Sequence, residues 1–242
     1  MSTIALNLTP DERQARVKAR RTLTYLLLFA IVMFFAGLTS AYVVSMSSGY
    51  WVRIALPTAF YVSTAFILLS TLTVQMALTS ARKGVQGRVA PLLVATLVLG
   101  LGFTWSQVKG WSQLVEKGNY AVGGILRNSG EYGRDYTISR QGVQLEMVDG
   151  RFYLPEDTRR MNPLNAELEE QKNTASSYLY TLTFAHMAHL FFGLLALVVM
   201  LVTALRGGYA AGQEVGLWSG TVYWHFLTGL WIYLLLFLLV VH

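Results

Sequence analysis

Five long apolar stretches divide this chain, and polar residues are concentrated between them. A hydrocarbon core of roughly 30 Å is crossed by about 20 helical residues, so each stretch is long enough to span a membrane. The stretches are Leu23–Met46, Ala55–Ser80, Val89–Gln107, Ser177–Leu205 and Leu217–Val241. Pro57 and Pro91 fall in the first turns of the second and third stretches, where a missing backbone donor does no harm. The pattern predicts an all-α membrane protein built as a bundle of five transmembrane helices.

Acidic residues are almost absent from these stretches. No Asp or Glu occurs between Arg13 and Val115, and ten of the 13 acidic residues lie within residues 112–176. An ionisable group at the bilayer centre is costly, and a spanning helix that keeps one usually uses it. The spans lack the carboxylates that proton pumps and ion carriers need, which argues against movement of charge through this chain.

The acidic stretch predicts β structure in place of a further span. Alternating runs at residues 136–139 and 143–148 indicate short strands. Asp149-Gly150 is typical of a tight hairpin turn into a further strand at residues 151–154. Residues 165–172 predict a short helix that leads into the fourth span.

The chain is therefore expected to have a small external loop or β-hairpin insertion between its third and fourth spans. That insertion is either a solvated loop that shields the helix ends or a docking surface for a neighbouring protein, and the sequence favours neither. The expected parts are a basic N-terminus at 1–21, spans one to three at 22–111, the insertion at 112–176 and spans four and five at 177–242.

Basic residues in the short flanks predict the orientation. One side of the membrane receives most of them, namely Arg13, Arg16, Lys18, Arg20, Arg21, Arg82, Lys83, Arg88 and Arg206, whereas the only short loop on the other side carries Arg53. Positive charge beside a span favours the cytoplasmic side, so we expect the N-terminus inside and both the insertion and the C-terminus outside. Membrane topology also accounts for the net charge of +6 without a nucleic-acid partner.

Few side chains are suited to metal or redox chemistry. The absence of cysteine excludes disulfides, iron–sulfur clusters and thiolate metal sites. His186 and His189 share one face of the fourth span, His225 lies in the fifth, and His242 ends the chain. Such a set permits a metal site, but no carboxylate is near in sequence to orient the ligands. Hydrogen bonds between helices or to lipid head groups are therefore favoured, and no catalytic or metal-binding residue is expected.

Small and hydroxyl-bearing residues mark the second and third spans. They allow transmembrane helices to approach closely and to bond across the contact, an interpretation favoured over a transport path. Ser40 with a histidine would suit an intramembrane serine protease, although its surroundings carry little of that pattern. The marked residues are Ser63, Thr64, Ser70, Thr71 and Gln75 in the second span and Gly100, Gly102 and Gln107 in the third.

The motifs in the spans resemble subunit III of cytochrome c oxidase and related heme–copper oxidases. The fourth span has the paired histidines in Thr183-Phe184-Ala185-His186-Met187-Ala188-His189, followed by Gly193, and the fifth has Tyr223-Trp224-His225-Phe226 with Trp231. Matching order is also kept by Phe34-Phe35-Ala36-Gly37, Ser63-Thr64, Leu68-Leu69-Ser70 and Leu99-Gly100 with Phe103 and Gln107. All five spans are similar to the five-helix bacterial form of that family.

The resemblance implies a non-catalytic subunit of an oxygen-reducing, proton-pumping complex in the bacterial plasma membrane. Its partners would be oxidase subunits I and II, which carry the heme and copper, while this chain would hold no redox centre and would bind phospholipid. Other respiratory complexes are further possible partners through residues 112–176. The residues expected to contact lipid or a neighbouring subunit are His186, His189, Trp224, His225, Thr64 and Gln107.

Several departures from the family bear on this expectation. Ile31 stands where many relatives carry a buried glutamate, and Thr228 where an acidic residue often follows the Trp-His-Phe run. The two further helices of longer members, which wall a lipid-filled cleft, are absent, so that cleft is missing or built by a neighbour. An accessory subunit of a nitric oxide reductase and a stand-alone membrane enzyme with a histidine-bound metal remain alternatives.

Overall fold

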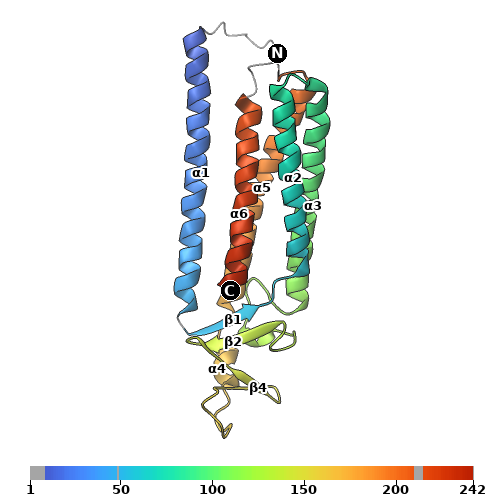
Figure 1. The fold of residues 1–242 in the computed structure, drawn as a ribbon. Helices are drawn as coiled ribbons and strands as arrows, with labels where there is room; N and C mark the ends of the chain where they lie inside the picture. Colours follow the sequence, from blue (N-terminus) through green and yellow to red (C-terminus); the bar gives the residue numbers. More distant parts are fainter. Residues whose placement is uncertain (1–8, 48, 210–214, 242) are drawn as a thin grey trace.

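Five long helices run side by side in the computed structural model, which describes residues 9–47, 49–209 and 215–241 (Figure 1). Within those residues, each of the five is long and apolar enough to cross a membrane. They are α1 (Pro10–Met46), α2 (Thr58–Arg82), α3 (Val89–Glu116), α5 (Thr174–Leu205) and α6 (Val215–Val240). The prediction of an all-α, five-span membrane protein is confirmed.

Short strands gather below one end of the bundle, which we call the cap end (Figure 1). The opposite end, where α1 begins, is called the basic end. A 3₁₀ turn at Gln86–Arg88 precedes α3 at the basic end, and the cap contains a second one at Ile125–Arg127. Its other elements are β1 (Tyr50–Ile54), β2 (Tyr136–Arg140), β3 (Val143–Gln144), β4 (Glu146–Val148), β5 (Arg151–Tyr153) and α4 (Asn165–Glu170).

The loop between the first two spans is part of the cap, which the sequence analysis did not predict. β1 pairs with β2 in antiparallel register, with Val52 opposite Ile138, and β3 extends the sheet on the far side of β2. Val52 and Ile138 are both buried. The sheet of the cap therefore pairs two strands that lie more than 80 residues apart in the sequence.

The hairpin predicted at Asp149-Gly150 is present, and it joins β4 to β5. Both turn residues have positive φ, at 50° and 75°, as a two-residue turn of this kind requires. The strand predicted over 143–148 is instead divided at Leu145. Its side chain is buried, and its N–H donates to the carbonyl of Ile138 at 2.8 Å. Burial of Leu145 thus redirects the chain from one sheet to the next.

A polar cluster joins the sheet to α4. The Tyr50 hydroxyl donates to the Glu167 carboxylate, and the Arg140 guanidinium lies 3.6 Å from that carboxylate and over the Tyr50 ring. Burial, followed by the hydrogen bond to Glu167, raises the pKa of Tyr50 to about 12. Tyr50 therefore keeps its proton, and donates it to Glu167, throughout the physiological pH range.

Helix α1 extends well beyond its apolar run. The hydroxyl of Thr9 accepts the N–H of Glu12 at 3.3 Å, while the Glu12 carboxylate accepts the N–H of Thr9 at 2.8 Å, so a capping box starts the helix. The segment predicted as a basic N-terminus at 1–21 is therefore helical from Pro10 onward.

The bundle is closely packed except along α1. A Cβ atom added to Gly110 of α3 would lie 2.3 Å from a ring carbon of Phe60 in α2, so this glycine allows the two helices to approach closely. By contrast α1 stands at the side of the bundle, next to α6 (Figure 1). Its buried residues form one narrow stripe, Ile31, Phe35, Thr39 and Tyr42.

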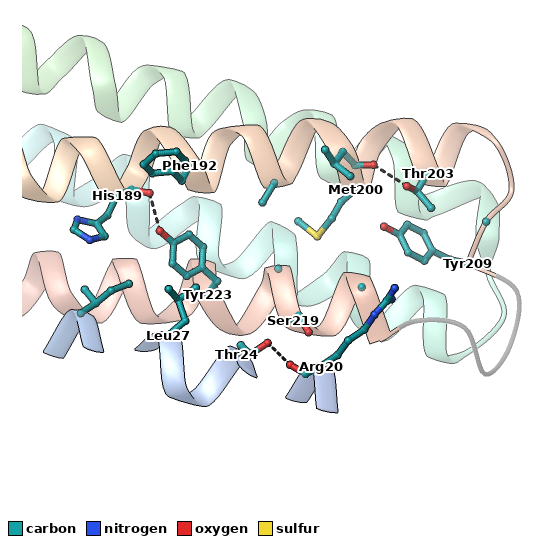
Figure 2. A pocket seen from close by; sticks show the side chains of 16 residues that line it. Arg20, Thr24, Leu27, His189, Phe192, Met200, Thr203, Tyr209, Ser219 and Tyr223 are labelled. Carbon is teal, nitrogen blue, oxygen red and sulfur yellow. Dashed lines mark hydrogen bonds between the residues drawn. The ribbon is translucent and has the colours of Figure 1, made fainter. Parts of the chain in front are cut away.

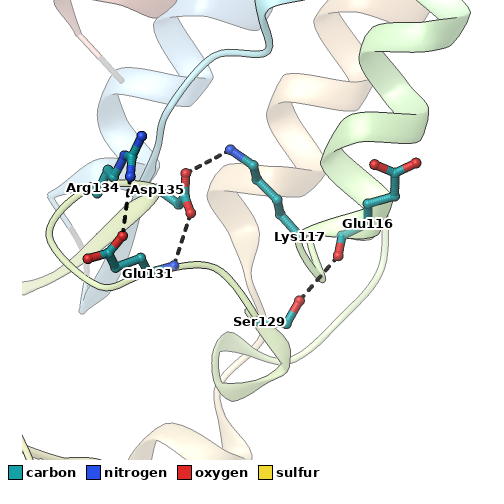
Figure 3. A network of polar contacts seen from close by, with 6 residues as sticks. All are labelled: Glu116, Lys117, Ser129, Glu131, Arg134 and Asp135. Atoms are coloured by element: carbon teal, nitrogen blue, oxygen red, sulfur yellow. Dashed lines mark hydrogen bonds and ion pairs between the residues drawn. The ribbon is translucent and has the colours of Figure 1, made fainter.

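An ion pair fixes the cap to the end of α3 (Figure 3). The Lys117 ammonium lies 2.7 Å from the Asp135 carboxylate, which also accepts the N–H of Glu131 at 3.0 Å. The hydrogen bond from Lys117, followed by that from Glu131, lowers the pKa of Asp135 below its ordinary value. The carboxylate form of Asp135 therefore stabilises the folded cap.

Acidification is expected to loosen this part of the cap. Because the folded-state pKa of Asp135 lies below the unfolded value of about 3.9, its stabilising contribution is present above about pH 4 and is lost as the pH falls through the folded pKa. Hydrogen–deuterium exchange of residues 129–140, corrected for intrinsic rates, should rise below about pH 4 in the wild type. Asp135→Asn should raise the exchange at neutral pH and remove that pH dependence, whereas Asp149→Asn in the exposed turn should change neither. An unchanged pH profile in Asp135→Asn would contradict the assignment.

Candidate functional site

Trp224 is the packing centre of four helices. It projects from α6, is 1% exposed, and donates its indole N–H to the Ser70 hydroxyl of α2 at 2.9 Å. A Cβ atom added to Gly100 of α3 would lie 2.9 Å from the indole, and one added to Gly193 of α5 would lie 3.3 Å from it. The two glycines therefore provide the space that the indole fills.

The polar stripe of α2 is used for contacts between helices. Thr64 accepts the indole N–H of Trp231 in α6 at 2.9 Å, and Ser63 accepts the side-chain amide of Gln107 in α3 at 2.9 Å. Thr71 lies 2.9 Å from His225 of α6. These bonds support the packing interpretation of the stripe.

His186 occupies the interior of the bundle. It is fully buried, and neither ring nitrogen has a hydrogen-bond partner among the described residues. Its ring lies between Phe103 and Trp231, with centroid distances of 5.8 and 5.4 Å. Aromatic faces are weak acceptors of N–H groups, so these rings provide only partial compensation. His186 therefore acts as a packed core residue in this chain.

His189 lies one turn further along α5 and faces a cavity. Its Nδ1 must donate to the Ala185 carbonyl, at 2.7 Å, because a carbonyl oxygen only accepts. Nε2 has no hydrogen-bond partner among the described residues, so it is free to contact a molecule in that cavity. The backbone carbonyl of His189 accepts the hydroxyl of Tyr223 in α6 at 2.9 Å (Figure 2).

His225 reaches the outer face formed by α2 and α6. Its Nε2 lies 2.9 Å from the Gln75 amide oxygen, and its Nδ1 lies 2.9 Å from the Thr71 hydroxyl. Because the amide oxygen only accepts, Nε2 is the donor. Gln75 is exposed, and its side-chain NH₂ has no hydrogen-bond partner among the described residues. The result is a polar spot on a surface that lies within the span of the helices.

A large cavity separates the basic half of α1 from α5 and α6 (Figure 2). Its volume is about 870 Å³, and α1 lines it from Arg20 to Ile31. Those eleven steps correspond to about 16 Å of helix, close to half of a roughly 30 Å hydrocarbon core. The small residues Gly216, Ser219 and Gly220 of α6 line it, and a Cβ atom added to Gly216 would have no atom within 4 Å. The cavity therefore extends over about one leaflet, with a guanidinium at its basic end.

The structure separates the predicted contact residues into two groups. His186, Trp224 and Gln107 are buried and contact this chain's own helices. Thr64 likewise bonds to α6. Contact with lipid or a neighbouring subunit therefore stays a prediction chiefly for His189 and His225, which reach a cavity and an outer face.

Among the residues that the structure describes, the predicted histidines are not grouped with one another. Within the described residues, no three His, Cys, Asp or Glu side chains are grouped so that they would hold a metal ion. Ser40, considered as a nucleophile, is an exposed residue of α1 and has no hydrogen bond to a histidine among those residues.

The sequence analysis did not identify the residues that build the cavity. Arg20, Thr24 and Tyr223 come from two helices whose relative tilt the sequence does not reveal. The one available signal was the Gly216–Gly220 spacing in α6, which is typical of a close approach between helices. Gly220 fits that pattern, because a Cβ atom added to it would lie 2.3 Å from the sulfur of Met200 in α5, whereas the space beside Gly216 is open.

Comparison with models of known protein families gives no match to this chain, and comparison with curated proteins gives no significant match. The likeness to oxidase subunit III therefore rests on the motifs in the spans alone.

Proposed function

We propose that this chain is the non-catalytic subunit III of a heme–copper terminal oxidase in a bacterial plasma membrane. One observation carries the proposal: the two motifs of the resemblance pack against each other. Trp224 lies against Gly193, the glycine that follows the paired histidines, and Tyr223 bonds to the backbone of His189 at 2.9 Å. Residues that match the family in sequence thus form a single three-dimensional unit.

The residue types in the helices favour a structural role for this chain over a catalytic one. The span-forming segments keep no carboxylate between Arg13 and Val115, and the histidines of the bundle bond to, or pack against, its own residues. Oxygen reduction and the redox centres then belong to subunits I and II. The proposed orientation puts the basic end in the cytoplasm and the cap on the opposite side of the membrane.

The polar spot on the α2 and α6 face supports contact with a partner inside the membrane. In hydrocarbon, an exposed amide without a partner is costly, so such groups normally face other protein or water. The amide NH₂ of Gln75 would donate to a hydrogen-bond acceptor on a helix of the catalytic subunit. We place that subunit over Gln75 and His225.

The cavity beside α1 supports binding of phospholipid. Its walls are mainly apolar, it has the length of one leaflet, and Arg20 lies where the head-group phosphate of a lipid would be. We propose that a lipid lies there, between α1 and the other helices. The cleft expected to be missing or built by a neighbour would then be replaced by one within this chain.

Loss of the chain should shorten the working life of the oxidase. In a strain that lacks it, the catalytic subunit should keep its heme spectrum, while oxygen consumption during turnover should decay several-fold faster than in the wild type. Re-expression of the chain should restore the slow decay. An oxidase that keeps the same activity and the same decay without this chain would contradict the proposal.

A further inference from the structure

A second cavity lies at the cap end, between the last turn of α1 and the sheet. Its volume is about 490 Å³, within the range of about 300–1,000 Å³ that is usual for small-molecule sites. Val43 and Met46 of α1 form one wall, and one face of the β1–β2–β3 sheet forms the other. This cavity is separate from the one beside Arg20, and the family resemblance does not extend to the sheet that builds it.

The pairing of the strands explains why this face of the sheet is polar. Trp51 lies opposite Ser139, and Arg53 lies opposite Thr137, so these side chains share one face. The alternate residues, including Val52 and Ile138, form the buried face. The cavity is therefore built on the polar face of a sheet that is held in register by its apolar face.

Arg53 determines the charge of the cavity. It is exposed, and it makes no ion pair with a described residue. No other charged side chain lines this cavity among the described residues. Thr137 and Gln144 add a hydroxyl and an amide without hydrogen bonds to described residues, and Ser139 adds a second hydroxyl. Such a set favours an anionic group that carries neighbouring hydroxyl or carbonyl oxygens.

The depth of the cavity identifies the kind of molecule that carries this group. The apolar run of α1 ends at Met46, and Val43 and Val44 are 45% and 67% exposed. The cavity therefore begins at the boundary between hydrocarbon and water, with an apolar wall toward the membrane and a guanidinium above it. Phospholipid head groups occupy that depth.

We propose that this cavity binds the head group of an anionic phospholipid from the leaflet at the cap end. The phosphate lies at Arg53, the glycerol and head-group oxygens bond to Thr137 and Gln144, and an acyl chain runs along Val43. The tight turn at Gln141 and Gly142, with φ of 49° and 85°, closes one end of the site. This site does not depend on the identity of the parent complex.

Native mass spectrometry of the full-length chain, titrated with phosphatidylglycerol in detergent, tests the site. Arg53→Gln should weaken one phosphatidylglycerol-binding event about tenfold or more, because a charge-assisted bond to phosphate is lost. Thr137→Val should weaken the same event by a smaller factor, and Arg53→Lys should largely preserve it. Arg151→Gln on the other hairpin and Arg20→Gln in the first cavity should leave this event unchanged.

Three outcomes would overturn the proposal. The first is that Arg53→Gln and Thr137→Val, both with circular dichroism like that of the wild type, bind phosphatidylglycerol as tightly as the wild type does. The second is that soluble glycerol phosphate binds as tightly as the lipid, which would show that the membrane anchor plays no part. The third is that a photoreactive residue introduced at Gln144 labels a partner protein instead of lipid in native membranes, which would assign the cavity to protein docking.

Discussion

Trp224→Ala should lower the free energy of unfolding by about 3–5 kcal/mol, the range found when a large aromatic side chain is removed from a packed core. The indole contacts α3 and α5 through Gly100 and Gly193, and it bonds to Ser70 in α2, so its removal leaves a cavity where four helices meet. Trp224→Phe should lower the unfolding free energy less, because it keeps a ring and loses the bond to Ser70, which is worth about 1 kcal/mol.

Equilibrium unfolding in mixed micelles measures both effects. Trp105→Ala provides the matched control, because Trp105 lies on α3 and is 58% exposed. That variant should change the unfolding free energy by less than about 1 kcal/mol. A loss in Trp224→Ala no larger than the loss in Trp105→Ala would contradict the role of Trp224 as the packing centre.

Tyr42→Ala should release α1 from the bundle. Tyr42 is fully buried, and its ring packs edge-to-face against Trp51, Tyr178 and Phe237, at centroid distances of 5.0, 5.5 and 5.1 Å. One residue therefore joins α1 to β1, α5 and α6. Its removal should cost about 3–5 kcal/mol, most of it in the attachment of α1.

The absence of cysteine makes this release measurable. Spin labels introduced through Leu27→Cys in α1 and Ser219→Cys in α6 report the distance across the first cavity. Tyr42→Ala should lengthen and broaden the measured distance distribution, whereas Val43→Ala, at an exposed neighbouring position, should leave it as in the wild type. Identical distributions in Tyr42→Ala and the wild type would show that α1 is held elsewhere.

Hydropathy predicted the spans because a membrane helix must be apolar over a fixed length. It missed β1, because the five residues Tyr50–Ile54 lie between two spans and find their partner strand in residues 136–140. The residue pair Asp149-Gly150 predicted the turn between β4 and β5, since a two-residue turn requires positive φ, which few residue types adopt readily. Local constraints were therefore readable, and pairings between distant segments were not.

The candidate site was predictable to a smaller extent. The motifs identified His189, Trp224 and His225, but they did not show that Trp224 is buried while the two histidines reach a cavity and an outer face. The space that Trp224 fills is explained by the positions of Gly100 and Gly193. Both cavities arise from the way α1 is placed against other elements. The hydrophobic pattern of a single segment does not predict that placement. In the sequence, Arg20 and Arg53 therefore indicated only the orientation of the helices in the membrane.

The measurement that tests the central claim most directly is purification of the tagged chain from its native membrane in a gentle detergent, followed by a visible absorption spectrum. Our proposal predicts heme a or heme o bands and oxygen consumption in the purified material. The double variant Gln75→Leu with His225→Leu should recover less heme per chain, while Leu69→Ala on a different face of α2 should recover as much as the wild type. A colourless chain without a heme-bearing partner would contradict the assignment to a terminal oxidase.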